Sequence, residues 1–433
     1  MTIMKTYFNA KNDLSFLPRE EIIKRQTKLL NQHIRYTREH SAYYRRTLAH
    51  LPQKDITIEE LAAFPTTSKH DLALYNDEFS AVPEQDVTDI CFTSGTTGKP
   101  CRIFYTKRDI DRLSYNDMLG FIAAGITPFD KVLLTCTIDC CFIAGLAYYG
   151  GVFKLGAAAI RNGLNTLESH AGIIRNEKPG AIVGVPSFLV KLGRYLQEGG
   201  MDCSSIRTLV CIGEPVRNRK MELTPLGEKL QAIWPDRFYS TYASSEIATS
   251  FTECSARCGG HPPGDLAIVE ILDEQGQPVP AGQTGEVTVT PLQVTGMPLI
   301  RFRTGDIGFI IDENCSCGRN TLRISPILGR KSQMLKIKGT TLFPNSFFIV
   351  LDSIDSIADY YMEVSGSALS DEVELFVAFS RDCADSAQIS ELLYAKTRLH
   401  IPIHTVSEAE AKARIYGSSR KPVRFFDLRE NNL

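Results

Sequence analysis

Apolar residues recur along this chain with two periods, and each period predicts one kind of element. Between residues 18 and 48 they recur roughly every three or four positions, with basic residues between them, as in an amphipathic helix. The apolar residues near one face of that helix are Ile22, Ile23, Leu29, Leu30 and Ile34. We therefore predict that this segment is helical and buries that face.

From about residue 88 to residue 250, short apolar runs alternate with helical patterns. The runs are Lys131–Thr137, Ala181–Val185 and Thr208–Ile212, and Phe188–Glu198 is one of the helical patterns. Strands that alternate with helices are typical of a parallel sheet covered by helices. We therefore predict a parallel α/β architecture here.

The pattern changes after residue 265. Ala267–Leu272 and Gly285–Thr290 are strand-like, and turn sequences rich in glycine and proline separate them. We predict a β-rich subdomain over residues 265–325.

Beyond residue 332 the pattern predicts a small αββαβ unit. It comprises a helix from Pro344, strands near 361–366 and 373–379, a helix over 386–399 and a strand near 401–406.

Length and charge limit the class of protein. A chain of 433 residues is too long for one ordinary core, so we expect at least two domains. The net charge of −2 gives no electrostatic footprint for nucleic acid or for an anionic membrane. The first residues lack the apolar core of a signal peptide, and no apolar run approaches the roughly 18 residues that span a bilayer. We expect a cytoplasmic protein whose thiols stay reduced.

One glycine-rich segment, residues 91–100, follows a strand-like stretch and has the composition of a phosphate loop. Its candidate phosphate ligands are Thr93, Ser94, Gly95, Thr96, Thr97, Gly98 and Lys99. Glycines allow backbone N–H groups to approach a polyphosphate, the hydroxyls add donors, and the lysine adds a cation. The spacing is not that of a Walker loop, which would need glycine in place of Thr93 and Ser or Thr in place of Pro100. The alternative is an ordinary turn rich in glycine and threonine.

This segment resembles the phosphate loop of the acyl-adenylating superfamily, which includes acyl-CoA ligases, luciferases and peptide-synthetase adenylation domains. Four further segments match that superfamily in the expected order. They are Tyr242-Ala243-Ser244-Ser245-Glu246, Arg301-Phe-Arg-Thr-Gly-Asp306, Gly329-Arg330, and Lys421 near the C-terminal end. Five motifs in one order, within a resemblance that runs from about residue 18 to residue 428, are far more specific than any one of them.

Within the superfamily the chain looks most like the phenylacetate–CoA ligase branch. The segments that carry this resemblance are an entry segment from Leu29 to Arg45, the pair Tyr105-Thr106, the stretch Gly213-Glu214-Pro215, and Cys315–Arg319. The resemblance implies an α/β fold in two parts. A large N-terminal adenylation domain, residues 1–330, would combine parallel α/β layers with a β-rich subdomain. A small mobile α+β lid, residues 331–433, would follow. Relatives are often dimers, which favours a homodimer, although no interface signal stands out in the sequence.

The same resemblance implies an ATP-dependent acid–CoA ligase that forms an acyl-AMP and releases pyrophosphate, with ATP, Mg²⁺ and coenzyme A as partners. Tyr242 would stack on adenine, with Ala243, Ser244 and the 213–215 stretch also contacting the nucleotide. Glu246 would bind Mg²⁺, because a hard cation prefers carboxylate oxygen. Asp306 would hold the ribose hydroxyls, and Arg330 would contact the nucleotide.

The lid would supply two further groups. Lys421 would be the catalytic cation, and Gly339 would allow the thiol of coenzyme A to approach. From the residues alone, other interpretations stay open. Lys421 and Arg330 could be surface charges, Glu246 a helix-cap residue, and Asp306 a turn residue.

Five soft metal ligands lie in two clusters: Cys254, Cys258 and His261, then Cys315 and Cys317. Zinc binds four such ligands tetrahedrally, and a closed set has a structural role. The resemblance favours Cys254, His261, Cys315 and Cys317, with Cys258 as a spare or a substitute. The alternative is a set of reduced surface cysteines without metal.

The acid pocket of the family draws on the segment where Asp139 and Phe142 stand. Phe142 keeps an aromatic wall, and Asp139 replaces a tyrosine, so it could receive an amino or hydroxyl substituent on an aromatic acid. Equally, Asp139 could only cap a helix beginning at Cys140. Two other functions remain as alternatives. One is an adenylating enzyme that serves an acceptor other than coenzyme A, and the other is a non-catalytic zinc-bearing binding protein.

Overall fold

The computed structural model describes residues 8–93, 101–139, 141–337, 340–367, 370–380, 386–397, 399–417 and 423–429. Three of the expected functional elements lie outside these residues: the loop residues 94–99, Gly339 and Lys421. The chain divides into two compact units. The first comprises Met1–Glu222 and Lys229–Pro326, and the second comprises Leu223–Glu228 and Ile327–Leu433.

The first unit begins with the predicted amphipathic helix, in two pieces. Helix α1 spans Arg19–His40 and α2 spans Ala42–Thr47. They are separated by Ser41, which has extended backbone angles and caps α2 by accepting a hydrogen bond from the Tyr44 backbone. Ile22, Leu30 and Ile34 are buried as expected, whereas Ile23 is 41% exposed, so its inclusion in the buried face was wrong. A helical face is only about 100° wide, and neighbouring positions 22 and 23 point in different directions.

Short helices follow before the first sheet. Helix α3 spans Lys69–Leu74. Among the described residues, the 3₁₀ helices are Ala10–Asn12, Glu59–Ala63, Asn76–Phe79, Glu84–Asp86 and, much later in the chain, Lys331–Gln333. A two-stranded antiparallel hairpin follows, formed by β1 (Val87–Thr93) and β2 (Cys101–Thr106).

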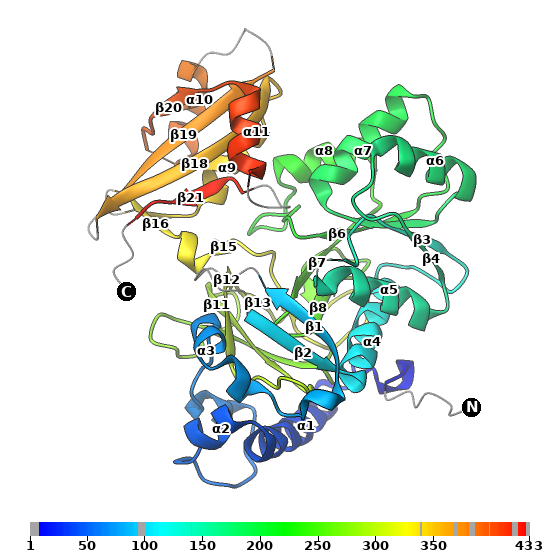
Figure 1. The fold of residues 1–433 in the computed structure, drawn as a ribbon, viewed down its shortest axis with the longest axis vertical. Helices are drawn as coiled ribbons and strands as arrows, with labels where there is room; N and C mark the ends of the chain where they lie inside the picture. The colour runs from blue at the N-terminus through cyan, green and yellow to red at the C-terminus, as the bar shows by residue number, and fades with distance from the viewer. Residues whose placement is uncertain are drawn as a thin grey trace. The chain divides into compact units, whose positions relative to one another are not determined.

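A nine-stranded sheet forms the centre of the first unit, in the order β13-β14-β9-β8-β7-β6-β5-β3-β4 (Figure 1). The strands are β3 (Lys131–Leu134), β4 (Ala158–Arg161), β5 (Ala181–Gly184), β6 (Thr208–Ile212), β7 (Phe238–Ser244), β8 (Thr249–Glu253), β9 (Gly260–His261), β13 (Ile310–Ile311) and β14 (Arg323–Ile324). Strands β4, β3, β5, β6 and β7 are parallel, which confirms the expected α/β architecture. Strand β5 is buried along its whole length, as strands covered on both faces are.

The helices of this region are α4 (Lys107–Ala123), α5 (Ile143–Leu155), α6 (Leu167–Glu177), α7 (Pro186–Glu198) and α8 (Pro225–Ile233). Helices α4 and α5 pack on each other, and they contact β8 and β3–β4 respectively. Helix α4 begins with a capping box, in which Thr106 and Asp109 bond each other's backbone N–H groups.

The predicted β-rich subdomain is an antiparallel sheet built on β10 (Ala267–Leu272), β11 (Gly285–Pro291) and β12 (Phe302–Gly308). Thr67, far earlier in the chain, forms a parallel bridge with Phe302 in β12. The N-terminal segment is thereby attached to this sheet.

The second unit contains the expected αββαβ elements. They are α9 (Pro344–Asp352), β18 (Ile357–Ser367), β19 (Ser370–Phe379), α10 (Ser386–Thr397) and β20 (Ile403–Thr405). The sequence pattern missed four others: β16 (Leu335–Ile337), β17 (Thr340–Leu342), α11 (Glu408–Tyr416) and β21 (Phe425–Asp427). The missed strands have three residues each, too few to display a period, and α11 buries only Ala411 and Ile415. A further short strand is β15 (Gly329–Arg330).

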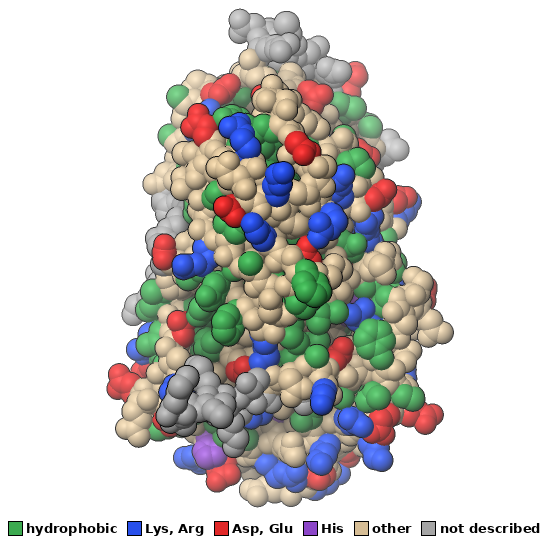
Figure 2. All heavy atoms as spheres, turned by 90° about the vertical axis from the view of Figure 1, so that its right-hand side faces the viewer, with side chains coloured by type: hydrophobic (Ala, Val, Ile, Leu, Met, Phe, Trp, Pro, Cys, Tyr) green, Lys and Arg blue, Asp and Glu red, His purple; other side chains and the backbone are tan. Residues whose placement is uncertain are grey.

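Basic and acidic side chains are interspersed among the described residues on the face that Figure 2 presents. That pattern agrees with the net charge of −2. Among the described helices, none has both the length and the apolar character that crossing a membrane requires.

Candidate active site

Two motifs that are far apart in the sequence meet through Tyr242 and Asp306. Tyr242 lies in β7 and donates a hydrogen bond from its hydroxyl to Asp306 Oδ2 at 2.9 Å. Burial, followed by the nearby Asp306 carboxylate, raises the pKa of Tyr242 well above its ordinary value. The hydroxyl therefore stays protonated and remains a donor at neutral pH.

Glu246 lies in the turn between β7 and β8, and its side chain is buried. Ser244 Oγ donates to Glu246 Oε2, and the Lys69 ammonium lies 3.5 Å from Oε1. Tyr105 supports the same turn by donating from its hydroxyl to the Ser245 carbonyl at 2.7 Å. No helix begins here, so the alternative of a helix-cap role for Glu246 was wrong.

Sequence reasoning missed Lys69, whose position depends on contacts with a distant strand. The Arg303 N–H donates to the Thr67 carbonyl at 2.7 Å, and the Thr67 N–H donates to the Arg301 carbonyl at 3.0 Å. Ser68 and Asp71 then form the capping box that starts α3 at Lys69. The capping box is visible in the sequence, but nothing local indicates that α3 begins beside Glu246.

Asp306 lies in a bulge of β12. The β11–β12 register pairs Thr288 with Arg303 and Glu286 with Ile307, so Thr304–Asp306 face Val287 alone. Gly305 has φ +80°, a left-handed conformation that favours glycine. Bulges of this kind re-aim a side chain beside a functional site. Asp306 is thus a bulge residue within a strand and not the residue of an ordinary turn.

Arg301, in the same motif, serves the structure. It is buried at φ +46°, bonds the carbonyls of Ala62 and Phe64 at 2.8 and 2.7 Å, and pairs with Glu270 at 3.0 Å. It therefore joins the N-terminal segment to the β-rich sheet.

The strand that leads to the phosphate loop contacts the expected acid segment. Thr93 is the last residue of β1, and the Phe92 N–H donates to the Cys141 carbonyl at 2.9 Å. Phe142 is half-buried and precedes α5, whose first residue is Ile143. Asp139 is exposed and lies before this start, so the alternative that it caps the helix was wrong.

The stretch Gly213-Glu214-Pro215 follows β6. Gly213 has φ +79°, and the Glu214 carboxylate accepts hydrogen bonds from the Ser187 backbone N–H and hydroxyl at 2.9 and 3.0 Å. Glu214 thus contacts the first turn of α7, where a carboxylate is favourable. These bonds fix the shape of the loop that the resemblance places against the nucleotide.

Four of the five candidate metal ligands come together. The ligand atoms of Cys254, His261, Cys315 and Cys317 all lie within 4.8 Å of one another, and no other metal-like cluster occurs among the described residues. The Sγ atoms of Cys254 and Cys315 are 3.5 Å apart, and Cys317 Sγ lies 3.5 Å from His261 Nε2. Ligands bonded at about 2.0–2.3 Å around one tetrahedral zinc ion have such separations. Cys258 is not part of this cluster.

The contacts around the cluster also fit a metal centre. His261 Nδ1 lies 2.9 Å from Thr321 Oγ1, which leaves Nε2 on the side of the thiols. A partner on the other ring nitrogen is the usual way in which a ligating histidine is oriented.

The second unit carries Arg330 in β15, where it is exposed. The carbonyls of Ser332 and Met334, which follow Arg330 closely in the chain, each accept a hydrogen bond from Arg429 at 3.1 Å. Arg429 also pairs with Asp427 and Asp371. Ser332 and Met334 are therefore held to the body of this unit.

The comparisons with known proteins agree with this geometry. Residues 29–296 match the model of the family described as AMP-binding enzyme. The phenylacetate–coenzyme A ligase of Thermus thermophilus is 31% identical over 405 residues, covering 90% of this chain and 89% of that protein. The Escherichia coli phenylacetate–coenzyme A ligase is 28% identical and covers 95% of both chains.

Among solved structures, 2-hydroxyisobutyryl-CoA ligase in its postadenylation state, in complex with 2-HIB-AMP, has a TM-score of 0.82 at 20% identity. The match covers 98% of this chain and 92% of that one. At this identity the match shows the fold, which is that of an adenylating ligase. The chain belongs to the AMP-binding enzyme family and, within it, to the phenylacetate–CoA ligases, which are AMP-forming acid–CoA ligases.

Proposed function

We propose that this chain activates an aromatic carboxylic acid of the phenylacetate type with Mg²⁺ and ATP, and transfers the acyl group to coenzyme A. The observation that carries the proposal is the convergence of β7, the Glu246 turn and β12, through the bond between Tyr242 and Asp306. This arrangement offers an aromatic ring, a carboxylate for ribose hydroxyls and a buried carboxylate for a divalent cation.

In the first half-reaction, a carboxylate oxygen of the acid attacks the α-phosphorus of ATP, and the bond to pyrophosphate breaks. Both reactants are anions, so positioning and charge neutralisation are the main tasks. Glu246 would hold Mg²⁺, which neutralises the polyphosphate when it is bound. The Lys69 ammonium beside Glu246 adds a second cation to the same region.

In the second half-reaction, the thiol of coenzyme A attacks the acyl carbonyl and AMP leaves. The resemblance assigns this step to the lid segment that includes Gly339. In the second unit, Arg429 bonds the backbone carbonyl of Ser332, near the start of the lid. We place the lid boundary between Arg330 and Lys331, four residues beyond the break between the two compact units, which follows Pro326.

Zinc is the metal that best fits the cluster of Cys254, His261, Cys315 and Cys317. Three thiolates and one imidazole fill a tetrahedral shell and leave no open position, so the role would be structural. The cluster would connect the loop after β8 to the loop between β13 and β14. The reduced thiols that such a site needs, together with the use of ATP and coenzyme A, favour the cytoplasm as the location. A homodimer stays a prediction from the resemblance.

The test of the proposed function is pyrophosphate release from ATP and Mg²⁺ with a panel of aryl acids, each with and without coenzyme A. We expect turnover that needs both the acid and coenzyme A, with phenylacetate among the substrates. Release that ignores coenzyme A would instead support transfer to another acceptor. Silence across the panel, with ATP binding intact, would favour the non-catalytic alternative.

Asp139 provides a narrower prediction about the choice of acid. If its exposed carboxylate receives an amino or hydroxyl substituent, Asp139→Ala should lower kcat/KM for substituted aryl acids roughly tenfold, since a bond to a charged group is worth about 1.5–3 kcal/mol. The value for phenylacetate should change little. An unchanged ranking of the acids in Asp139→Ala would remove Asp139 from the acid pocket.

A further inference from the structure

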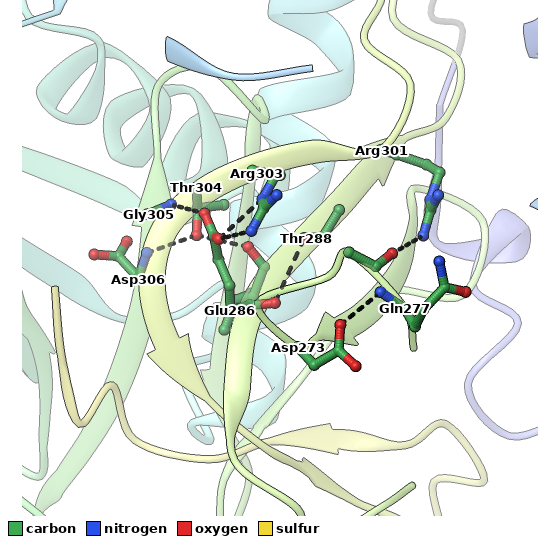
Figure 3. Close-up of polar contacts among 11 residues, drawn as sticks. Asp273, Gln277, Glu286, Thr288, Arg301, Arg303, Thr304, Gly305 and Asp306 are labelled. Carbon is green, nitrogen blue, oxygen red and sulfur yellow. Dashed lines mark hydrogen bonds and ion pairs between the residues drawn. The ribbon is translucent and has the colours of Figure 1, made fainter. Parts of the chain in front are cut away.

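The bulge that carries Asp306 is held by a buried carboxylate on the neighbouring strand. Glu286 lies in β11, and its side chain is only 7% exposed. Its Oε2 atom accepts hydrogen bonds from Arg303 Nε and Nη2 at 2.9 and 2.5 Å. Its Oε1 atom accepts from the Gly305 backbone N–H at 3.2 Å (Figure 3). One carboxylate thus bonds both the residue before the bulge and the residue in its middle.

Two further bonds complete the shape of the bulge. Thr304 donates from its hydroxyl to the Val287 carbonyl at 2.8 Å, and the same hydroxyl accepts from the Asp306 N–H at 3.1 Å. Figure 3 shows the Asp306 carboxyl group turned away from Glu286. Glu286 therefore bonds the backbone of the bulge at Gly305, the residue next to Asp306.

A second buried Glu–Arg pair on the same sheet shows what is particular to Glu286. Glu270 pairs with Arg301 at 3.0 Å, and their side chains are 12% and 3% exposed. The other side-chain hydrogen bonds of Arg301 go to the carbonyls of Ala62, Phe64 and Gly276, outside the bulge. Only Glu286 of these two glutamates bonds a backbone N–H of the bulge.

We propose that Glu286 is a positioning residue for the nucleotide. By bonding Arg303 and the Gly305 N–H together, it fixes the bulge so that the Asp306 carboxylate meets the two ribose hydroxyls. Charge-assisted hydrogen bonds are strong enough for this task. Accurate positioning matters, because a misplacement of about 1 Å can lower an enzyme's rate about a hundredfold. The inference rests on the proposed role of Asp306 in the preceding subsection.

The test measures equilibrium binding of ATP and of 2′,3′-dideoxy-ATP by isothermal titration calorimetry in Mg²⁺, so it does not depend on which acid is the substrate. We expect the wild-type chain to bind ATP more tightly than the dideoxy analogue. In Glu286→Gln, the Kd of the dideoxy analogue divided by the Kd of ATP should fall about tenfold. The reason is that a misplaced Asp306 carboxylate no longer accepts hydrogen bonds from the ribose hydroxyls. The matched control Glu270→Gln should keep the wild-type ratio. A general loss of protein stability would weaken the binding of both nucleotides equally and leave the ratio of their Kd values unchanged.

Two further variants distinguish an error in the proposed ribose contact of Asp306 from an error in the proposed role of Glu286. Glu286→Asp keeps the charge beside Arg303 but is one methylene shorter, so it should also lose the preference, and it replaces Glu286→Gln if that variant does not fold. Asp306→Asn tests the underlying role. If Asp306→Asn keeps the wild-type ratio, the proposed ribose contact is wrong. If Asp306→Asn loses the ratio while the Glu286 variants keep it, the inference about Glu286 is overturned.

Discussion

Replacement of Cys315 by serine is expected to release the zinc proposed for the Cys254, His261, Cys315 and Cys317 cluster and to destabilise the first unit. The four ligand atoms lie within 4.8 Å of one another and would form one closed shell around the proposed zinc, so removing one thiolate would open it. Structural zinc contributes on the order of ten kcal/mol to local folding. Even a partial loss on the order of 5 kcal/mol should lower Tm by about 10 °C or more. The measurements are metal content of the purified protein and a thermal melt followed by circular dichroism.

Cys258 supplies the matched control for this prediction. It lies in the same loop as Cys254, between β8 and β9, but outside the cluster. Cys258→Ser should therefore keep both metal content and Tm. Metal that survives Cys315→Ser but is lost in Cys258→Ser would show that the ligand set is wrong. A chelator such as EDTA should lower the Tm of the wild-type protein toward that of Cys315→Ser, because removal of a ligand that binds only the folded state removes its stabilisation.

Lys421→Ala is expected to lower the rate of acyl-adenylate formation by about 10²–10³-fold, the usual effect of removing one donor that stabilises transition-state charge. Lys421 lies outside the described residues, so this expectation comes from the resemblance of the C-terminal motif. ATP binding should persist, because the nucleotide contacts proposed for Tyr242 and Asp306 belong to the first unit. The measurement is pyrophosphate exchange with phenylacetate.

Measuring the second half-reaction separately shows whether Lys421→Ala impairs adenylation alone. When acyl-AMP is supplied, Lys421→Ala should still form the coenzyme A thioester, since the resemblance implies that the lysine serves the adenylation step. Lys412 is a suitable control, because it is an exposed lysine of α11 that pairs with Glu408 at 3.0 Å. Lys412→Ala should leave both half-reactions near the wild-type rate. Near-normal pyrophosphate exchange in Lys421→Ala would remove the lysine from the mechanism.

Local sequence was sufficient for the strands and helices that bury a regular stripe. The apolar runs at Ala181–Val185 and Thr208–Ile212 became β5 and β6, because a strand covered on both faces needs apolar residues at every position. It was insufficient for β16, β17 and β21, because three residues do not establish a period. These strands depend on their partners: β21, for example, is paired with β18.

The candidate site divides in the same way. Motif order alone named Tyr242, Glu246 and Asp306, because their residue types and spacing are characteristic of the family. Sequence offered five metal ligands, and the resemblance favoured Cys254, His261, Cys315 and Cys317. The folded chain brings these four together and leaves out Cys258, although Cys258 is nearest to His261 in sequence. Lys69 and Glu286 had no motif at all. Their places follow from a bridge between Thr67 and Phe302 and from a shift of register between β11 and β12. No periodic pattern in a sequence reveals a contact between residues more than two hundred positions apart, or the direction of a side chain in a bulge. Both depend on how the strands pair in three dimensions.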